Sequence, residues 1–393
     1  MSSSQPATAG MSAAAPITAL INAISQVRAF GLEPQQANSL LQELVIVALS
    51  THPDLVEPIQ RYGWLPIEDA FTKAVDVPGL VSALQKFLYE RLSELGSGAY
   101  GVVYKARNRE TNEVLAVKKP KYSFNDDGFP GSTIREISAL KELQHENIVQ
   151  LKDIISTVNG SHVYLVLECL DCDLRTYLNT CNEASHLPNI KSIVYQILKA
   201  VHHAHANMVI HRDLKPQNIL VDKASGRIKV TDFGLARPYL PPGKAYTEKV
   251  VTLYYRAPEL LLGAPTYSNS VDLWSVGCIM AELINFDPLF KADSEIGLLY
   301  KIFEALGTPT NEQWSDIQQT EHFHAEFPRW RAKDMSQVVP RIADDPDAQD
   351  LLLGLLTYDP NKRLKAKQAL EHRWFWDVAL PNMPPPKATP AAI

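Results

Sequence analysis

Three polar side chains with complementary chemistry stand close together in residues 211–218, which read His-Arg-Asp-Leu-Lys-Pro-Gln-Asn. Asp213 can accept a proton from a hydroxyl group, Lys215 can neutralise a migrating anion, and Asn218 carries an oxygen that suits Mg²⁺. Asp232 opens an Asp-Phe-Gly sequence 14 residues after Asn218 and adds a second oxygen ligand. These groups together predict the transfer of a highly charged group, such as a phosphoryl group, to a hydroxyl acceptor.

A glycine-rich segment precedes these residues in the chain. Residues 96–103 read Gly-Ser-Gly-Ala-Tyr-Gly-Val-Val, and glycines let the backbone approach phosphate oxygens because they have no Cβ. A dinucleotide-binding fold uses a similar triplet, but a helix begins there at once. Here strand-like sequence follows, and the apolar stretch 114–117 leads to Lys118, which we expect to bind the α- and β-phosphates of a nucleotide. Glu136, in a segment that opens a helix, is the carboxylate expected to hold Lys118.

Taken together and in this order, these segments resemble the catalytic core of eukaryotic protein kinases. The resemblance implies an α+β, bilobal fold, with an antiparallel sheet and one helix in the first lobe and a mostly helical second lobe. It implies ATP and Mg²⁺ as cofactors. The implied catalytic residues are Asp213, Lys215, Lys118, Glu136 and Thr252. The implied Mg²⁺ ligands are Asn218 and Asp232. The implied nucleotide-binding residues are Leu95, Gly96, Gly98, Gly101, Val103, Ala116, Lys118, Leu167, Glu168, Leu170, Asp173 and Leu220.

A closer resemblance, over about residues 88–376, is to the cyclin-dependent kinases. Residues 130–136, Pro-Gly-Ser-Thr-Ile-Arg-Glu, resemble the PSTAIRE helix through which that family contacts its cyclin. Further segments that match the family are 232–237, 250–259, 293–296 and 306–309. A mitogen-activated kinase would be expected to carry a Thr-x-Tyr pair in its activation segment, whereas residues 246–248 read Tyr-Thr-Glu.

The cyclin-dependent resemblance implies a switch operated by phosphorylation. Thr247 occupies the position of the activating phosphate, which adds nearly two negative charges. The arginines implied as its ligands are Arg135, Arg212 and Arg237. Val250 and Val251, with Arg256 behind them, resemble the pocket that accepts proline directly after the phosphorylated residue. The implied substrates are therefore protein Ser-Pro and Thr-Pro sites. The implied partners are a cyclin-type activating subunit and a kinase that phosphorylates Thr247.

Three positions depart from the family pattern. Ala99 replaces the first residue of a Thr-Tyr pair, so Tyr100 is the inhibitory phosphorylation site that the pattern leaves. Gly131 and its neighbours change the start of the PSTAIRE-like segment, which leaves the identity of the cyclin open. Leu167 stands where many relatives have phenylalanine, and it should change inhibitor fit more than catalysis.

Several other motifs are expected to be structural. Glu259, which ends an Ala-Pro-Glu sequence, is expected to form a buried ion pair with Arg363. Residues 272–277 resemble the long helix that anchors the catalytic loop. The histidines of residues 202–205 lack a matched set of further metal ligands. The Cys-x-x-Cys pair of residues 169–172 lacks a second cysteine pair at zinc-binding spacing. We therefore interpret neither as a metal site.

Amino-acid composition and hydrophobic pattern divide the chain into several expected parts. With 393 residues, a hydrophobic fraction of 46% and a net charge of −6, the chain suits one large two-lobed domain with an accessory segment. No basic run predicts nucleic-acid binding, and no apolar stretch predicts a membrane span. The expected parts are a disordered start (1–16), a helical accessory module (17–87), a kinase domain (88–376) and a Pro-rich unstructured tail (377–393). Family analogy favours the nucleus and cytoplasm as its location.

Two questions remain open at this stage. Apolar stripes on neighbouring helices usually pack against one another, so we expect residues 17–87 to form a small core of their own. These stripes could instead bind a partner or press on the kinase lobe. In the second case the module would activate the kinase in place of a cyclin. The alternative to an active enzyme is a catalytically weak kinase-fold scaffold, against which the intact Asp213 and Asp232 weigh.

Overall fold

The computed structural model describes residues 88–98, 101–121, 131–156, 163–180, 189–238, 253–324, 326–378 and 380. The expected module of residues 17–87 and both expected disordered termini lie outside these residues. The chain divides into two compact units, Met1–Pro130 with Leu151–Cys169 and Gly131–Gln150 with Leu170–Ile393. The first described unit is a sheet and the second is mostly helical, which confirms the predicted bilobal α+β fold. The helix expected in the first lobe, Gly131–Glu142, is grouped with the second unit instead.

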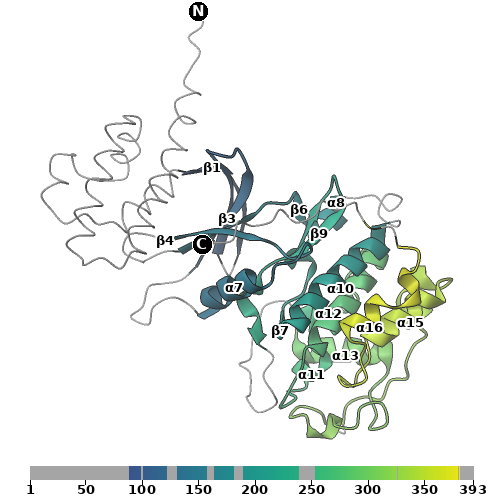
Figure 1. The fold of residues 1–393 in the computed structure, drawn as a ribbon. Coiled ribbons are helices and arrows are strands. Elements are labelled where there is room, and N and C mark those ends of the chain that lie inside the picture. The colour runs from purple at the N-terminus through teal and green to yellow at the C-terminus, as the bar shows by residue number, and fades with distance from the viewer. Residues whose placement is uncertain are drawn as a thin grey trace, which may run out of the picture. The chain divides into compact units, whose positions relative to one another are not determined.

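The first unit contains a five-stranded antiparallel sheet in the order β1-β2-β3-β5-β4 (Figure 1). Its strands are β1 (Tyr89–Gly98), β2 (Gly101–Asn108), β3 (Val114–Pro120), β4 (Leu151–Ser156) and β5 (Val163–Glu168). Apolar and β-branched residues favour strands in β3 and β5. Residues 101–107, 114–119 and 162–168 are β-branched or alternating in sequence, a pattern that predicts strands. The structure confirms all three, with one end of each shifted by a single residue.

The register of this sheet collects side chains expected to bind the nucleotide. Val103 lies opposite Lys118, and Ala116 lies opposite Leu167. Paired residues in an antiparallel sheet point to the same face, and so do residues two apart on one strand. These four side chains therefore share one face of the sheet. Lys118 is 7% exposed there.

The second unit is built around a buried helix. Its helices are α7 (Gly131–Glu142), α8 (Leu174–Thr180), α10 (Ile190–Ala206), α11 (Pro258–Leu261), α12 (Ser270–Asn285), α13 (Glu295–Leu306), α14 (Met335–Val338), α15 (Pro346–Leu355) and α16 (Ala366–Leu370). α12 is buried along nearly its whole length and packs against α10 and α15 (Figure 1). A Cβ added to Gly277 would lie 2.9 Å from Leu356 Cδ2 and 3.1 Å from Leu355 Cβ, so glycine lets α12 lie close to the end of α15 without moving these side chains.

Short strands and turns connect these helices and carry the candidate catalytic residues. A three-stranded sheet has the order β6-β8-β9, and β7 pairs with β10. The strands are β6 (Cys172–Asp173), β7 (Val209–Ile210), β8 (Ile219–Asp222), β9 (Arg227–Val230) and β10 (Arg237–Pro238). The single-turn 3-10 helices are η3 (Pro216–Asn218), η4 (Phe233–Leu235), η5 (Leu253–Tyr255), η6 (Ile317–Gln319), η7 (Pro340–Ile342) and η8 (Arg373–Phe375). In the part of the chain that the structure describes, no helix is long and apolar enough to cross a membrane.

Candidate active site

Asp213, Lys215 and Asn218 meet in the loop between β7 and β8. The Lys215 Nζ donates to Asp213 Oδ2 at 2.6 Å, and the Asn218 side-chain amide donates to the Asp213 carbonyl at 2.8 Å. All three side chains are buried. The same Asn218 amide also donates to Asp213 Oδ2 at 3.2 Å. The carboxylate that would accept a proton is therefore held in place by an ammonium group and an amide, both from the following residues of the same loop.

Asp272 on α12 fixes the backbone of this loop. Its carboxylate accepts hydrogen bonds from the backbone N–H of His211 at 2.9 Å and of Arg212 at 2.8 Å. His205 Nε2 contacts the same carboxylate at 2.8 Å. Burial works to raise the pKa of Asp272, but the hydrogen bonds and the charge of His205 outweigh it and lower that pKa. Arg212 has a left-handed φ of 71°, and the bonds to Asp272 stabilise this unusual conformation. The expected anchoring role of residues 272–277 is confirmed.

His211 connects the loop to the segment that holds Asp232. Its Nε2 lies 2.9 Å from the carbonyl oxygen of Thr231, and its ring meets Phe233 edge-on with centroids 4.7 Å apart. The Thr231 N–H also donates to the Asn218 carbonyl at 2.9 Å. The two residues expected to bind Mg²⁺, Asn218 and Asp232, therefore come from segments that are bonded to each other.

Glu136 lies beside the same segment. α7 packs against η4, and a Cβ added to Gly234 would lie 3.4 Å from Asp232 Oδ1 and 3.8 Å from Glu136 Oε2. The Asp232 and Glu136 carboxylates therefore both lie close to the backbone at Gly234. Lys118 belongs to the first unit, so its ion pair with Glu136 stays a prediction.

The remaining residues expected to bind the nucleotide are divided between the two units. Those in the first unit are Leu95, Gly96, Gly98, Gly101, Val103, Ala116, Leu167 and Glu168. Those in the second are Leu170, Asp173 and Leu220. Asp173 pairs with Leu220 between β6 and β8. Its carboxylate also accepts hydrogen bonds from the backbone N–H and the hydroxyl of Thr176, at 3.0 and 2.7 Å, and so caps the start of α8.

The three arginines expected to bind a phosphate come from neighbouring segments of the second unit. Arg237 pairs with Ile210 between β10 and β7, two residues before Arg212. Arg135 lies on α7, which packs against η4 just before Arg237. Within the described residues, the buried Nε of Arg135 has no hydrogen-bond partner.

Several predicted residues lie outside the described structure. They are Ala99, Tyr100, Thr247, Val250, Val251 and Thr252. Arg256, which was expected to lie behind the two valines, is described, and its Nη1 donates to Glu295 Oε1 on α13 at 2.6 Å.

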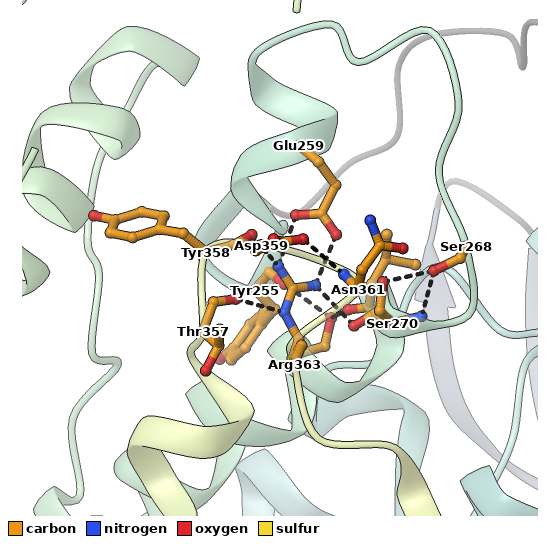
Figure 2. Close-up of polar contacts among 11 residues, drawn as sticks. Tyr255, Glu259, Ser268, Ser270, Thr357, Tyr358, Asp359, Asn361 and Arg363 are labelled. Carbon is orange, nitrogen blue, oxygen red and sulfur yellow. Dashed lines mark hydrogen bonds and ion pairs between the residues drawn. The ribbon is translucent and has the colours of Figure 1, made fainter. Parts of the chain in front are cut away.

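The predicted ion pair between Glu259 and Arg363 is confirmed (Figure 2). The two Nη atoms of Arg363 donate to the two carboxylate oxygens of Glu259 at 2.7 and 2.9 Å. The remaining donors of Arg363 bind the carbonyl oxygens of Ser270, Thr357 and Tyr358, at 2.9, 2.8 and 3.2 Å. Both side chains are fully buried. This pair ties α11 to the start of α12 and to the segment before α16.

Sequence reasoning missed a second buried cluster. Tyr255 donates to Glu282 Oε2 at 2.6 Å, while Arg175 on α8 donates to the Tyr255 hydroxyl at 2.8 Å and lies 2.5 Å from Glu282 Oε1. Burial, followed by the charge of Glu282, raises the pKa of Tyr255, and burial also raises the pKa of Glu282. The signal was available, because an acidic residue inside an otherwise apolar helix requires a buried partner.

Two of the histidines in residues 202–205 contact other side chains of the protein. They lie on α10, where His205 binds Asp272, and His203 stacks on His145 with ring centroids 4.8 Å apart. In the described ranges, no group of three or more His, Cys, Asp or Glu side chains is arranged to hold a metal ion.

A sequence model of the protein kinase domain matches residues 89–375 of the chain. The match covers the sheet, the catalytic loop and the helical unit, so the chain belongs to the protein kinase family and is a phosphotransferase of that kind.

Protein kinases use ATP and Mg²⁺. The donor set of this chain fits the metal, since a carboxylate and an amide oxygen are ligands that Mg²⁺ accepts. The Asn218 amide nitrogen donates to Asp213, so the amide oxygen is the atom that remains for a cation. Asp232 contributes a carboxylate from the neighbouring segment.

Proposed function

We propose that this kinase is of the cyclin-dependent type and phosphorylates Ser-Pro and Thr-Pro sites of proteins. In this proposal it becomes active when a cyclin-type subunit binds and when Thr247 carries a phosphate. The family match supports phosphoryl transfer from ATP. The finer assignment is supported by residues 130–136, 250–259 and 293–296, which resemble that family. The proposed location, in the nucleus and cytoplasm, follows from the same analogy.

The division of α7 into an exposed and a buried side is the observation that carries this proposal. Ile134 is 55% exposed, whereas Glu136, two residues further on, is 3% exposed beside Gly234. An apolar side chain exposed to this extent on a helix can bind a partner. A partner that covers Ile134 would bias the position of α7 and thereby of the Glu136 carboxylate. A cyclin-type subunit is a partner of this kind.

The proposed chemistry relies on positioning and charge neutralisation. Asp213 accepts or orients the proton of the substrate hydroxyl. Lys215, 2.6 Å from that carboxylate, neutralises the migrating phosphoryl group. When bound, Mg²⁺ neutralises the phosphate oxygens, and Asn218 and Asp232 would hold it.

The second unit contains the arginines proposed to bind the phosphate of this switch. A phosphate on Thr247 needs guanidinium partners, because it carries nearly two negative charges. Arg135, Arg212 and Arg237 belong to segments that pack together or pair. The buried Nε of Arg135, which has no hydrogen-bond partner among the described residues, is a donor suited to such a ligand.

The first test measures phosphorylation of a Ser-Pro peptide and of its Ser-Ala counterpart. The kinase is purified from its own cells, so that any activating subunit is retained. A strong preference for Ser-Pro is expected, and equal use of both peptides would reduce the assignment to a protein kinase without proline specificity.

A second measurement tests the role of α7. Ile134→Glu should remove the co-purifying subunit and the activity together. Leu353→Glu is the matched control, because Leu353 on α15 is also an exposed apolar side chain, at 49%. The control should retain both, and a retained subunit in Ile134→Glu would contradict the proposed role of α7.

A further inference from the structure

The sheet of the first unit has a second apolar face, opposite the one that carries Ala116 and Lys118. Leu115, Ile155 and Val166 form a buried cluster, against which Tyr89, Val117 and Tyr164 pack. We call these six residues the outer cluster. The register places Val117 opposite Val166, and Ile155 opposite Tyr164. The outer cluster therefore extends across β3, β5 and β4 on a single face.

The middle of the outer cluster is protected from water. Val166, Leu115 and Ile155 are 0%, 2% and 3% exposed. Antiparallel strands with one wet face alternate apolar and polar residues, but β3 and β5 are apolar on both faces over most of their length. Strands of this composition normally lie between two packed layers.

A half-buried polar pair at the edge of the outer cluster supports this interpretation. The Tyr89 hydroxyl donates to Asp153 Oδ2 at 3.1 Å, and the Ile154 N–H donates to Asp153 Oδ1 at 2.7 Å. Burial raises the pKa of the Asp153 carboxyl above its usual value. A carboxylate on a wet sheet face would not experience such desolvation.

The described residues of the first unit supply no second layer for this face. They comprise the five strands, their flanking residues and Leu88. Leu88 itself is 7% exposed, and its carbonyl oxygen accepts a hydrogen bond from the Arg109 N–H at 2.8 Å. The next residue, Tyr89, belongs to the outer cluster. The chain therefore enters the sheet directly at the face that needs a cover.

Residues 17–87 are the part of this chain best suited to cover it. They precede Leu88 without a linker sequence, and their apolar residues recur at helical spacing. A helix rises 1.5 Å per residue and strands lie about 4.8 Å apart, so a stripe such as residues 40–48 would cross roughly three strands.

Charge favours the same occupant. In residues 17–87 acidic side chains outnumber basic ones. The same sheet face carries two cations, since the Arg91 guanidinium lies 3.9 Å from the Tyr104 ring centroid and Lys119 Nζ lies 5.9 Å from that of Tyr164.

We propose that residues 17–87 form a helical layer on the outer cluster and complete the first unit as a sheet covered on that face. This proposal rests on the kinase fold and is independent of the cyclin-dependent assignment. Because Ala116 and Lys118 lie on the opposite face, a layer on the outer cluster leaves the expected nucleotide face free. The segment is then a structural part of the kinase lobe rather than a separate domain.

The test uses the full chain with a site-specific protease sequence inserted at Pro78-Gly79, a turn by its sequence. After cleavage, the fragment that ends there should co-elute with the kinase on size exclusion, and the KM for ATP should be unchanged. Val117→Lys should weaken retention at least tenfold, because a charged group would be buried against the layer. Val114→Lys is the matched control on the same strand, since Val114 points to the opposite face, and it should retain the fragment.

Every outcome bears on the proposal. A fragment that separates from the wild-type kinase overturns it, and so does retention that Val117→Lys and Val114→Lys leave equal. A dimer that forms through the outer cluster when the fragment leaves would assign this face to a second copy instead. Tyr164→Lys, on the same face, replaces Val117→Lys if that variant loses its cooperative thermal unfolding, and it should release the fragment as well.

Discussion

Substituting Arg363 with alanine removes a guanidinium group that uses all five N–H donors inside the second unit. Glu259, 1% exposed, would be left as a buried carboxylate without its cation. The carbonyl oxygens of Ser270, Thr357 and Tyr358 would lose a donor as well. The substitution therefore removes one partner of a buried ion pair and disrupts a hydrogen-bond network at the same time.

The magnitude follows from this geometry. Breaking a buried pair by removing one partner costs about 3–5 kcal/mol, because a buried charge is left uncompensated. For a unit of roughly 200 residues each kcal/mol lowers Tm by about 2–4 °C, so the expected loss is on the order of 10 °C. Arg363→Lys should recover only part of it, since an ammonium group cannot make the bidentate contact.

The assay is urea and thermal unfolding of the full chain. Arg373→Ala is the matched control, because Arg373 also forms an ion pair, with Asp347 at 2.7 Å, but its side chain is 52% exposed. An exposed pair contributes only about 0–1 kcal/mol. An Arg363→Ala variant as stable as Arg373→Ala would refute the reasoning.

Three further predictions concern the catalytic loop, the missed cluster and the response to pH. Asp213→Asn should lower turnover of a peptide substrate by ~10²–10⁴-fold with the fold intact, because the proton acceptor is lost; near-normal turnover would remove Asp213 from the mechanism. Arg175→Met should destabilise the protein by roughly 1–3 kcal/mol in urea, because Glu282 loses its cation, and Arg175→Lys should recover part of this loss. Burial, with the charge of His203, lowers the pKa of His145 from 6.5 to about 4, so an unfolded chain binds a proton there that the native protein does not. This group therefore leaves the free energy of unfolding unchanged above pH 6.5 and lowers it as the pH drops toward 4. His145→Gln should reduce the loss of stability in this pH range. An unchanged dependence of stability on pH would show that His145 is not its source.

The sequence predicted those elements whose signal is local. β2, β3 and β5 follow from short apolar, β-branched runs, and α7 follows from a helix-forming segment after Gly131. The Glu259–Arg363 pair and the anchoring helix were predicted through a family resemblance rather than from spacing alone. Contacts within the catalytic loop were predictable for the same reason.

Other features depend on residues distant in the chain. The sequence did not predict β4, because Asp153 interrupts its apolar pattern. The hydrogen-bond partner of Asp153 is Tyr89, 64 positions away in the chain. Arg175 meets Glu282 only when α8 and α12 are folded together. No local pattern contains such pairings, although an acid in an apolar helix indicates that one exists.

The bonds from Asp272 to the backbone of His211 and Arg212 have a consequence for the order in which the protein opens. A surface loop ordinarily exchanges its amide hydrogens through small local fluctuations. These two amides are bonded to a buried carboxylate on α12, so they exchange only when these charge-assisted bonds break. In exchange kinetics these two loop amides should therefore resemble the amides of a buried helix, and removal of the Asp272 carboxylate should make them exchange as fast as those of an ordinary surface loop.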